Sequence, residues 1–253
     1  MLSISHIDMN SSIDLTMRAW YNHSVKMALF RAKNSTIVFA QKTEDTMEQK
    51  NVSLQTLRRL PVYLHYLRTV QDQCVNISAT AIADKLGLND VQVRKDLASV
   101  SGSGRPKTGY NTLELLQQLE TYLGCGSSST TVLIGAGNLG KALMAYSGFD
   151  DYGLEIVAAF DRNPNLIGTE ISGKPVFPME KLGQVCREYN IHVGIITVPA
   201  TVAQAVCDEL VSHGIRAIWN FAPTILRVPA GVQVENENLA SSLAVLSQHW
   251  RKV

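Results

Sequence analysis

Apolar residues along the chain follow two different spacings. After Ser53, leucines recur three and four positions apart, which is the spacing of one buried helix face. Pro61 lies within this stretch and predicts a helix start or a kink. After Thr130, short apolar runs alternate with helical stretches, which is typical of a parallel α/β sheet. The pattern therefore predicts an α/β protein with a helical part followed by a sheet part.

Turn residues and apolar runs predict the individual elements. In the helical part we expect two short helices within 77–97, a glycine-rich hairpin over 101–110 and an amphipathic helix over 112–123. In the sheet part we expect strands at Thr131–Ile134, Ile156–Phe160, His192–Thr197 and Ala217–Asn220.

The chain of 253 residues has room for two domains of roughly 100 residues each. The turn-like sequence GCGSSS starting at Gly124 indicates a boundary, so we expect domains at 47–124 and 125–253. Residues 1–46 show no sustained periodicity. We expect Met47 to be the natural start and 1–46 an extension, with a disordered arm as the alternative.

The sequence SATAIADKLGLNDVQVRKDL fits a helix-turn-helix. Ser78 and Asn89 are suited to cap the first and second helices, and Gly87 supplies the tight turn between them. In the second helix Val93 and Leu97 are expected to point inward. An ordinary helix pair with a solvated basic face would show the same spacing.

Side chains that read DNA follow from this arrangement. On the outer face of the second helix lie Gln92, Arg94 and Lys95, which can contact base edges and phosphates. Arg105 and Lys107 lie near the tip of the glycine-rich hairpin, as in a basic wing that enters a minor groove. These five residues are the predicted DNA contacts.

Charge is distributed unevenly, although the formal net charge is only +1. Residues 51–110 carry eight basic and four acidic side chains, whereas residues 111–253 carry nine basic and 13 acidic ones. A basic segment joined to an acidic remainder suits a nucleic-acid reader fused to a small-molecule domain.

The sequence TTVLIGAGNLGKAL predicts a dinucleotide-binding turn. Gly135, Gly137 and Gly140 form a GxGxxG pattern between an expected strand and an expected helix. Asp161, 21 positions after Gly140, can accept hydrogen bonds from ribose hydroxyls, which favours NAD over NADP. The adjacent Arg162 leaves this selectivity open. A turn that binds nothing, or that binds another nucleotide such as coenzyme A, is the alternative.

Two further strand ends are expected at the same edge of the sheet, where ligands bind in open parallel sheets. Ordinary strand-to-loop transitions are the alternative explanation for both. The residues expected to face the nicotinamide are Thr197, Val198, Pro199, Asn220, Phe221 and Ala222.

Several classes of protein are disfavoured. No apolar run is long enough to span a membrane, and no signal peptide is recognisable, so we expect a cytoplasmic protein. The four cysteines form no CxxC pair or Cys/His cluster, which indicates unreactive thiols and no metal site. His192 and His213 have no acidic partner nearby, and no separate substrate domain is left, so an enzyme is not expected.

Six segments follow one another along the chain: LRRLPVYLHYL, QVRKDLASVSGSGRPKTGY, VLIGAGNLGKAL, AAFD, TVPA and WNFAP. In their order and spacing, these segments resemble the Rex family of redox-sensing transcriptional repressors. The resemblance runs from about Ser53 to the C-terminus. It implies an N-terminal winged helix-turn-helix domain and a C-terminal Rossmann-type parallel sheet domain. It also implies a homodimer that binds inverted-repeat operator DNA, senses NADH and NAD⁺, and leaves the operator when NADH binds.

The resemblance also assigns residues. The cofactor site would comprise Gly135, Ala136, Gly137, Asn138, Leu139, Gly140, Asp161, Thr197–Pro199 and Asn220–Ala222. A switching network in the family would correspond to Arg68, Tyr146 and Asn238, where Asn238 replaces an expected Asp and so lacks its charge. The C-terminal helix, about Leu239–Trp250, would exchange between subunits. An NAD-dependent oxidoreductase and a coenzyme A-binding regulatory module are the competing functions.

Overall fold

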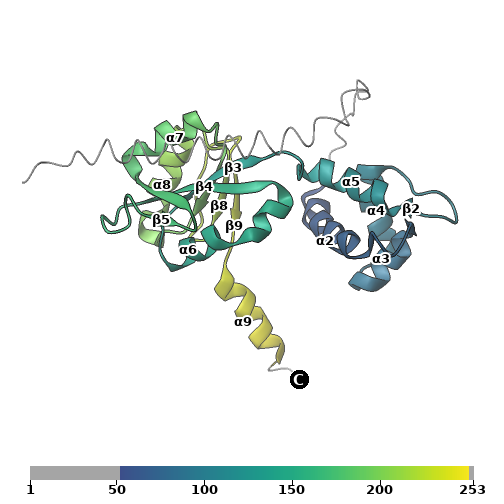
Figure 1. Ribbon diagram of the computed structural model, residues 1–253. Coiled ribbons are helices and arrows are strands. Elements are labelled where there is room, and N and C mark those ends of the chain that lie inside the picture. Colours follow the sequence, from purple (N-terminus) through teal and green to yellow (C-terminus); the bar gives the residue numbers. More distant parts are fainter. Residues whose placement is uncertain (1–51, 251–253) are drawn as a thin grey trace, which may run out of the picture. The chain divides into compact units, whose positions relative to one another are not determined.

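The computed structural model describes residues 52–250, and their contacts divide them into two compact units (Figure 1). The helical unit runs to Ser128 and also includes Ser147–Leu154. The sheet unit consists of Ser129–Tyr146 and the chain from Glu155 onward. The expectations for residues 1–46 lie outside the described residues.

The helical unit contains four α-helices, two short strands and a 3₁₀ turn among its described residues. The predicted helix over 112–123 and the two short helices flanking Gly87 are confirmed. In chain order, the elements are α2 (Leu54–Val70), β1 (Asn76–Ile77), α3 (Ala79–Leu86), α4 (Asp90–Ser101), β2 (Tyr110–Asn111), α5 (Thr112–Leu123) and η1 (Ser147–Tyr152).

Local sequence explains where these helices begin and end. The side chains of Ser78 and Asn89 accept hydrogen bonds from the first turns of α3 and α4, as predicted. Gly87 ends α3 with φ of 65°, a conformation that is strained for other residues. Pro61 lies inside α2 rather than at its start, because the apolar face of this helix continues past it.

The core of the helical unit joins all four helices. Leu60, Leu64 and Leu67 of α2 are fully buried with Val93 and Leu97 of α4. The leucine spacing and the helix-turn-helix pattern predicted these positions to be inward, whereas Leu54 and Leu57, which share the leucine spacing, are 60% and 37% exposed. The helix packing therefore follows directly from the apolar positions in the sequence.

The sheet unit alternates strands with helices. Its elements are β3 (Ser129–Ile134), α6 (Asn138–Ala145), β4 (Leu154–Asp161), β5 (Glu170–Ile171), β6 (Lys174–Pro178), η2 (Met179–Lys181), α7 (Leu182–Glu188), β7 (Val193–Ile196), α8 (Ala200–Ser212), β8 (Ala217–Asn220), β9 (Gln233–Asn236) and α9 (Leu239–Trp250).

The seven strands lie in the order β5-β6-β4-β3-β7-β8-β9. The pairs β3–β7, β7–β8, β8–β9 and β4–β6 are parallel, and β5 joins the edge antiparallel to β6. The chain adds strands outward on one side of β3 and then, from β7, on the other. Such a reversal creates a crevice at the carboxyl ends of β3 and β7, where ligands bind in this class of fold.

All four predicted strands are present, with ends shifted by up to two residues. The strands β5, β6 and β9 were not predicted. β9 reads QVEN and leaves three of its four side chains exposed at the sheet edge, so it has no apolar run to reveal it. Only its pairing with β8 makes it a strand.

No helix within residues 52–250 is long and apolar enough to cross a membrane. The same residues contain no cluster of three or more histidine, cysteine or acidic side chains suited to a metal ion.

Candidate functional site

The helix pair α3–α4 presents a polar face. Ile82, Val93 and Leu97 are fully buried between the helices and the rest of the core, which fixes the orientation of α4. Arg94 and Lys95 are exposed on the opposite face, as predicted. The buried apolar positions therefore decide which side of α4 is available to a partner.

Arg94 already has a partner on its own helix. Its Nη2 lies 3.2 Å from Asp90 Oδ2, one helical turn earlier. Both side chains are largely exposed, so this pair contributes only about 0.3–0.5 kcal/mol to stability. Such a weak bond leaves Arg94 able to turn toward a phosphate or a base.

A buried carboxylate that the sequence pattern did not predict lies on the inward side of α4. The side chain of Asp96 is 2% exposed and accepts bonds from Arg59 Nε at 2.6 Å and Nη2 at 3.0 Å. Tyr63 Oη donates at 2.8 Å and Thr56 Oγ1 at 3.1 Å. Gln92 Nε2 also donates to Asp96, at 2.8 Å. Gln92, a predicted DNA contact, therefore forms a hydrogen bond within the helical unit.

This cluster keeps Asp96 ionised. Burial by itself raises the pKa of the carboxyl, but the hydrogen bonds from Arg59, Tyr63, Gln92 and Thr56 outweigh burial and lower it. Burial raises the pKa of the Tyr63 hydroxyl, and the hydrogen bond to Asp96 raises this pKa further. An acidic residue three positions after the inward Val93 was the available signal, because that spacing keeps Asp96 on the buried side of α4.

The predicted wing closes through a tight turn. Arg105 N–H donates to the Gly109 carbonyl at 2.8 Å, and Gly109 N–H donates back at 2.9 Å. Lys107, between them, has φ of 67°. Gly109 has no room for a side chain, because a Cβ would collide with the Ile77 carbonyl. Arg105 and Lys107 are consequently exposed at the tip of a short loop pinned to β1.

In the sheet unit, the three glycines after β3 have different surroundings. Gly135 has φ of 102°, and a Cβ on it would lie 2.9 Å from Val198 Cγ1. A Cβ on Gly140 would collide with the Gly135 carbonyl oxygen. Gly137 is exposed, and a Cβ there would meet nothing within 4 Å. The first and third glycines permit close packing, whereas the second leaves open space beside the backbone.

This open space lies at the N-terminus of α6. Gly137 is the N-cap of α6 and provides no side chain to cap its first N–H groups. Uncapped N–H groups at a helix N-terminus suit a phosphate, which the helix dipole also favours. The turn from Gly135 to Gly140, which includes Ala136, Asn138 and Leu139, therefore fits a pyrophosphate group of a dinucleotide.

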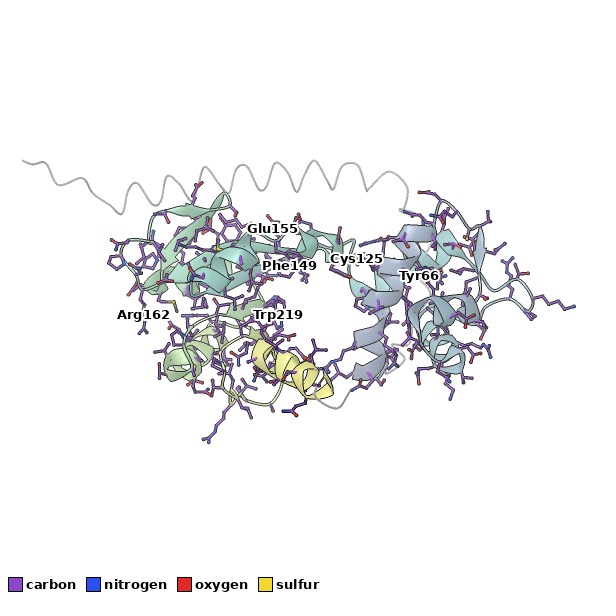
Figure 2. The ribbon with its side chains drawn as sticks, turned by 90° about the horizontal axis from the view of Figure 1, so that it is seen from below. Tyr66, Cys125, Phe149, Glu155, Arg162 and Trp219 are labelled. Carbon is purple, nitrogen blue, oxygen red and sulfur yellow. The ribbon has the colours of Figure 1, made fainter. Side chains whose placement is uncertain are left out.

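Asp161 lies beside this turn at the end of β4. Its Oδ2 accepts the Ala136 N–H at 2.7 Å, and its Oδ1 accepts the Asn163 N–H at 2.8 Å. A carboxylate has further acceptor positions for two ribose hydroxyls. The neighbouring Arg162 is exposed, and Figure 2 labels it. The predicted acid is thus tied to the glycine turn.

The loop after β7 contacts the same turn. Thr197 Oγ1 donates to the Gly135 carbonyl at 2.6 Å and lies 3.1 Å from the Ile134 carbonyl. Val198 lies against Gly135, and Pro199 is the N-cap of α8. The structure therefore brings Thr197 and Val198 to the glycine turn, as their place at the strand end predicted.

Asn220 has a different environment from the one expected. It is fully buried, and its Nδ2 donates to the Thr224 carbonyl and to Asn236 Oδ1, both at 2.9 Å. Its Oδ1 accepts the Ala222 N–H at 3.0 Å. The amide thus orders the loop after β8, because both polar atoms of the side chain are bonded within the chain. A contact between Asn220 and a ligand stays a prediction.

Next to Asn220, Phe221 is partly buried, and its ring centroid lies 4.5 Å from that of Trp219. Figure 2 labels Trp219 in the sheet unit. Ala222 is buried. Phe221 and Ala222 thus give the chain directly after β8 an apolar character.

The three predicted switch residues have the following environments. Arg68 Nη2 lies 2.8 Å from Glu120 Oε1 and donates to the Asp151 carbonyl at 2.9 Å. Tyr146 is 60% exposed. Asn238 Oδ1 accepts the Ser241 N–H at 3.0 Å, so it caps the start of α9. A network joining the three stays a prediction.

The histidines and cysteines named in the sequence have the following surroundings. His192 is exposed, and the ring of His213 packs against Gly183. All four cysteines are free, and burial raises the pKa of Cys186 to about 11. A thiol with that pKa is protonated at neutral pH and therefore unreactive.

A basic helix pair with a short wing and a sheet with a dinucleotide-type crevice define a class of protein: a DNA-binding regulator that carries its own nucleotide-binding domain. Comparisons with known proteins agree with this class. Residues 51–98 match the family described as "Putative DNA-binding protein N-terminus", and residues 127–224 match "CoA binding domain".

The curated relatives give the family. The chain is 40% identical over 211 residues to "Redox-sensing transcriptional repressor Rex" of Porphyromonas gingivalis, covering 83% of this chain and 97% of that one. It is 42% identical to the protein of the same name from Clostridium botulinum, covering 79% and 95%. The chain belongs to the Rex family of redox-sensing transcriptional repressors, a family of regulators rather than enzymes.

Solved structures show the same relationship. The structure of RSP in complex with β-NAD⁺ and operator DNA superposes with a TM-score of 0.75 at 36% identity, covering 82% of this chain and 94% of that one. RSP in complex with β-NADH gives a TM-score of 0.71 at 36% identity, covering 80% and 96%. RSP is described as a Rex-family repressor.

Proposed function

We propose that this protein represses transcription by binding an inverted-repeat operator as a homodimer and that NADH releases it. The observation that carries the proposal is the presence in one chain of an exposed basic helix-turn-helix and a glycine turn bonded to Asp161. The solved complexes of RSP with NAD⁺, operator DNA and NADH support the assignment of both ligands.

The DNA contacts are assigned to α4 and the wing. Gln92, Arg94 and Lys95 on α4 would contact the major groove, and Arg105 and Lys107 would contact the minor groove or phosphates. All five are exposed side chains. The functional domains then correspond to residues 47–124 and 125–253, with the segment after Tyr146 returning to the first of them.

The cofactor is assigned to the crevice at the ends of β3 and β7. The pyrophosphate would lie on the turn from Gly135 to Gly140 and the adenosine ribose on Asp161. The nicotinamide would lie near Thr197–Pro199 and Phe221. Because the oxidised ring carries a positive charge, burying it beside Phe221 costs more free energy than burying the neutral reduced ring.

A single titration tests both ligands. Labelled operator DNA from the protein's own promoter is bound at fixed salt, and NADH or NAD⁺ is then added. We expect NADH to release the DNA at concentrations at which NAD⁺ does not. Equal release by NADH and NAD⁺ would contradict redox sensing. Both cofactors would then prefer the free protein over the DNA-bound protein by the same factor, whatever the charge of the ring.

The homodimer is supported by α9. Its Leu239, Leu243, Val245 and Leu246 are each more than 60% exposed, so residues 52–250 leave these apolar side chains of α9 largely uncovered. A second copy of the chain supplies such cover if α9 exchanges between subunits. We also propose that the protein works in the cytoplasm, where DNA and pyridine nucleotides are both present.

One other ligand is favoured by a specific observation. Residues 127–224 match the family described as "CoA binding domain". Coenzyme A would use the same glycine turn, but it does not require Asp161 at the end of β4. Thermal unfolding with NADH and with acyl-coenzyme A distinguishes the two, because a ligand that binds the native protein raises the midpoint.

A further inference from the structure

The bond between Gln92 and Asp96 constrains how α4 can read a base. Gln92 is an exposed residue of α4, whereas Asp96, one turn later, is 2% exposed at its side chain. The two are joined by the bond from Gln92 Nε2 to Asp96 Oδ1 at 2.8 Å. An exposed side chain is therefore fixed to a buried one.

Chemistry determines which end of the amide faces Asp96. The carboxylate is ionised and can only accept hydrogen bonds. It already receives donors from Arg59, Tyr63 and Thr56, which hold it in place on α2. Turning the Gln92 oxygen toward it would place two acceptors together and lose a bond to a charged group. The amide nitrogen must face Asp96, so the oxygen faces away from it.

We infer that Asp96 is a positioning residue that fixes the Gln92 amide to read adenine. This inference rests on the proposed role of α4 as the DNA-reading helix. With one N–H bonded to Asp96, the amide still offers its oxygen and its second N–H. This pair complements the N6 amino group and N7 of adenine, whereas guanine offers two acceptors at the corresponding positions.

The bond to Asp96 also removes freedom that a free glutamine would keep. An unbonded amide can turn over and offer its two edges equally, and long polar side chains lose substantial rotamer entropy when they are immobilised. A side chain that is held before it meets DNA loses less on binding. The base preference is therefore expected to depend on Asp96, which itself does not reach the DNA-facing surface.

The first test uses wild-type protein and altered DNA. Each base pair of one operator half-site is changed in turn, and Kd is measured for wild type and for Gln92→Ala at one salt concentration. We expect one adenine at which wild type discriminates and Gln92→Ala does not. Replacing that adenine with purine, which lacks the amino group, should weaken wild-type binding about tenfold and leave Gln92→Ala insensitive.

The second test addresses Asp96. In Asp96→Asn the new amide can either accept from or donate to Gln92, so both orientations of Gln92 become accessible. We expect its discrimination between adenine and purine to fall to less than half of the wild-type ratio. Tyr63→Phe is the matched control, because it removes one donor to Asp96 but leaves the bond to Gln92. It should keep the full ratio even if its Tm is lower.

The outcomes separate this inference from the proposed function. The inference is overturned if Gln92→Ala alters discrimination at a guanine or thymine instead, if purine is tolerated, or if folded Asp96→Asn keeps the full ratio. If Asp96→Asn does not fold, the purine measurements on wild type and Gln92→Ala decide. If wild type binds no operator at all, the proposed function fails instead. If wild type discriminates adenine but NADH does not release it from the operator, only the proposed redox sensing is contradicted.

Discussion

At the scale of single residues, the three glycines after β3 have separate roles. Gly135 and Gly140 have no room for a Cβ, whereas Gly137 has open space beside it and a φ of −70° that any residue adopts. Packing therefore explains the first and third glycines, whereas packing does not exclude a side chain at the second. This contrast leads to a test that separates folding from binding.

We expect Gly140→Ala to destabilise the sheet unit by about 1–3 kcal/mol, because the added methyl overpacks the turn. We expect Gly137→Ala to keep the wild-type Tm but to weaken NADH binding at least about tenfold, because the methyl separates the backbone from the pyrophosphate. Thermal unfolding and fluorescence titration with NADH measure the two effects. A normal NADH affinity in Gly137→Ala would show that the ligand does not approach this backbone.

At the scale of elements, Asp96 joins α4 to α2. Four side chains from these two helices donate to one buried carboxylate, and Arg59 is its ion-pair partner. Removing a partner from such a pair leaves a charge uncompensated, which typically costs several kcal/mol. The orientation of α4, the proposed DNA-reading helix, thus depends on a polar contact as well as on the apolar core.

This contact makes the stability of the helical unit depend on pH. The pKa of Asp96 is lower in the folded state than its ordinary value of 3.8, so its contribution is complete above that value and is lost as the pH falls through the folded pKa. We expect hydrogen-exchange protection of α4 to decrease below about pH 4 more steeply in wild type than in Asp96→Asn. Parallel curves for the two proteins would contradict this expectation.

The helix α9 provides a second prediction at this scale. Leu243 and Leu246 are 67% and 66% exposed, although burial would favour both by roughly 2 kcal/mol each. We expect Leu243→Asp to convert the dimer to a monomer, as measured by sedimentation velocity, and to weaken operator binding. Ser241→Asp, on the same helix but at a polar position, should remain dimeric. A dimeric Leu243→Asp would place the subunit interface elsewhere.

At the scale of the whole molecule, the part of the chain that the structure describes passes between the two units after Ser128, Tyr146 and Leu154. The helix α6 begins at the cofactor turn and leads into Ser147–Leu154, which belongs to the helical unit. There, Arg68 of α2 donates to the Asp151 carbonyl. A short covalent path therefore joins the glycine turn to the helical unit, and we propose it as a route of coupling between the two proposed sites.

We expect Arg68→Ala to bind NADH and operator DNA separately with near-normal affinities but to show weaker coupling between them. Coupling energies are typically about 1–3 kcal/mol, so the NADH-dependent change in operator Kd should shrink at least about threefold. Arg187→Ala, which removes an exposed charge from α7, is the control and should retain full coupling. Full coupling in Arg68→Ala would exclude this path.

The sequence by itself determined the elements that depend on local patterns. The leucine spacing of α2, the caps Ser78 and Asn89, and the glycine turn before α6 all follow from short-range geometry and apolar periodicity, which neighbouring residues fix. For the same reason the class of fold and both candidate sites could be predicted.

Only the tertiary structure decided the contacts between distant parts of the chain. The Asp96 cluster joins residues up to 40 positions apart, the amide of Asn220 is used within its own loop, and Ser147–Leu154 joins the helical unit. β9 is a strand only because it pairs with β8. Such contacts leave no periodic trace in the sequence, because the partners of a buried polar group are set by packing in three dimensions.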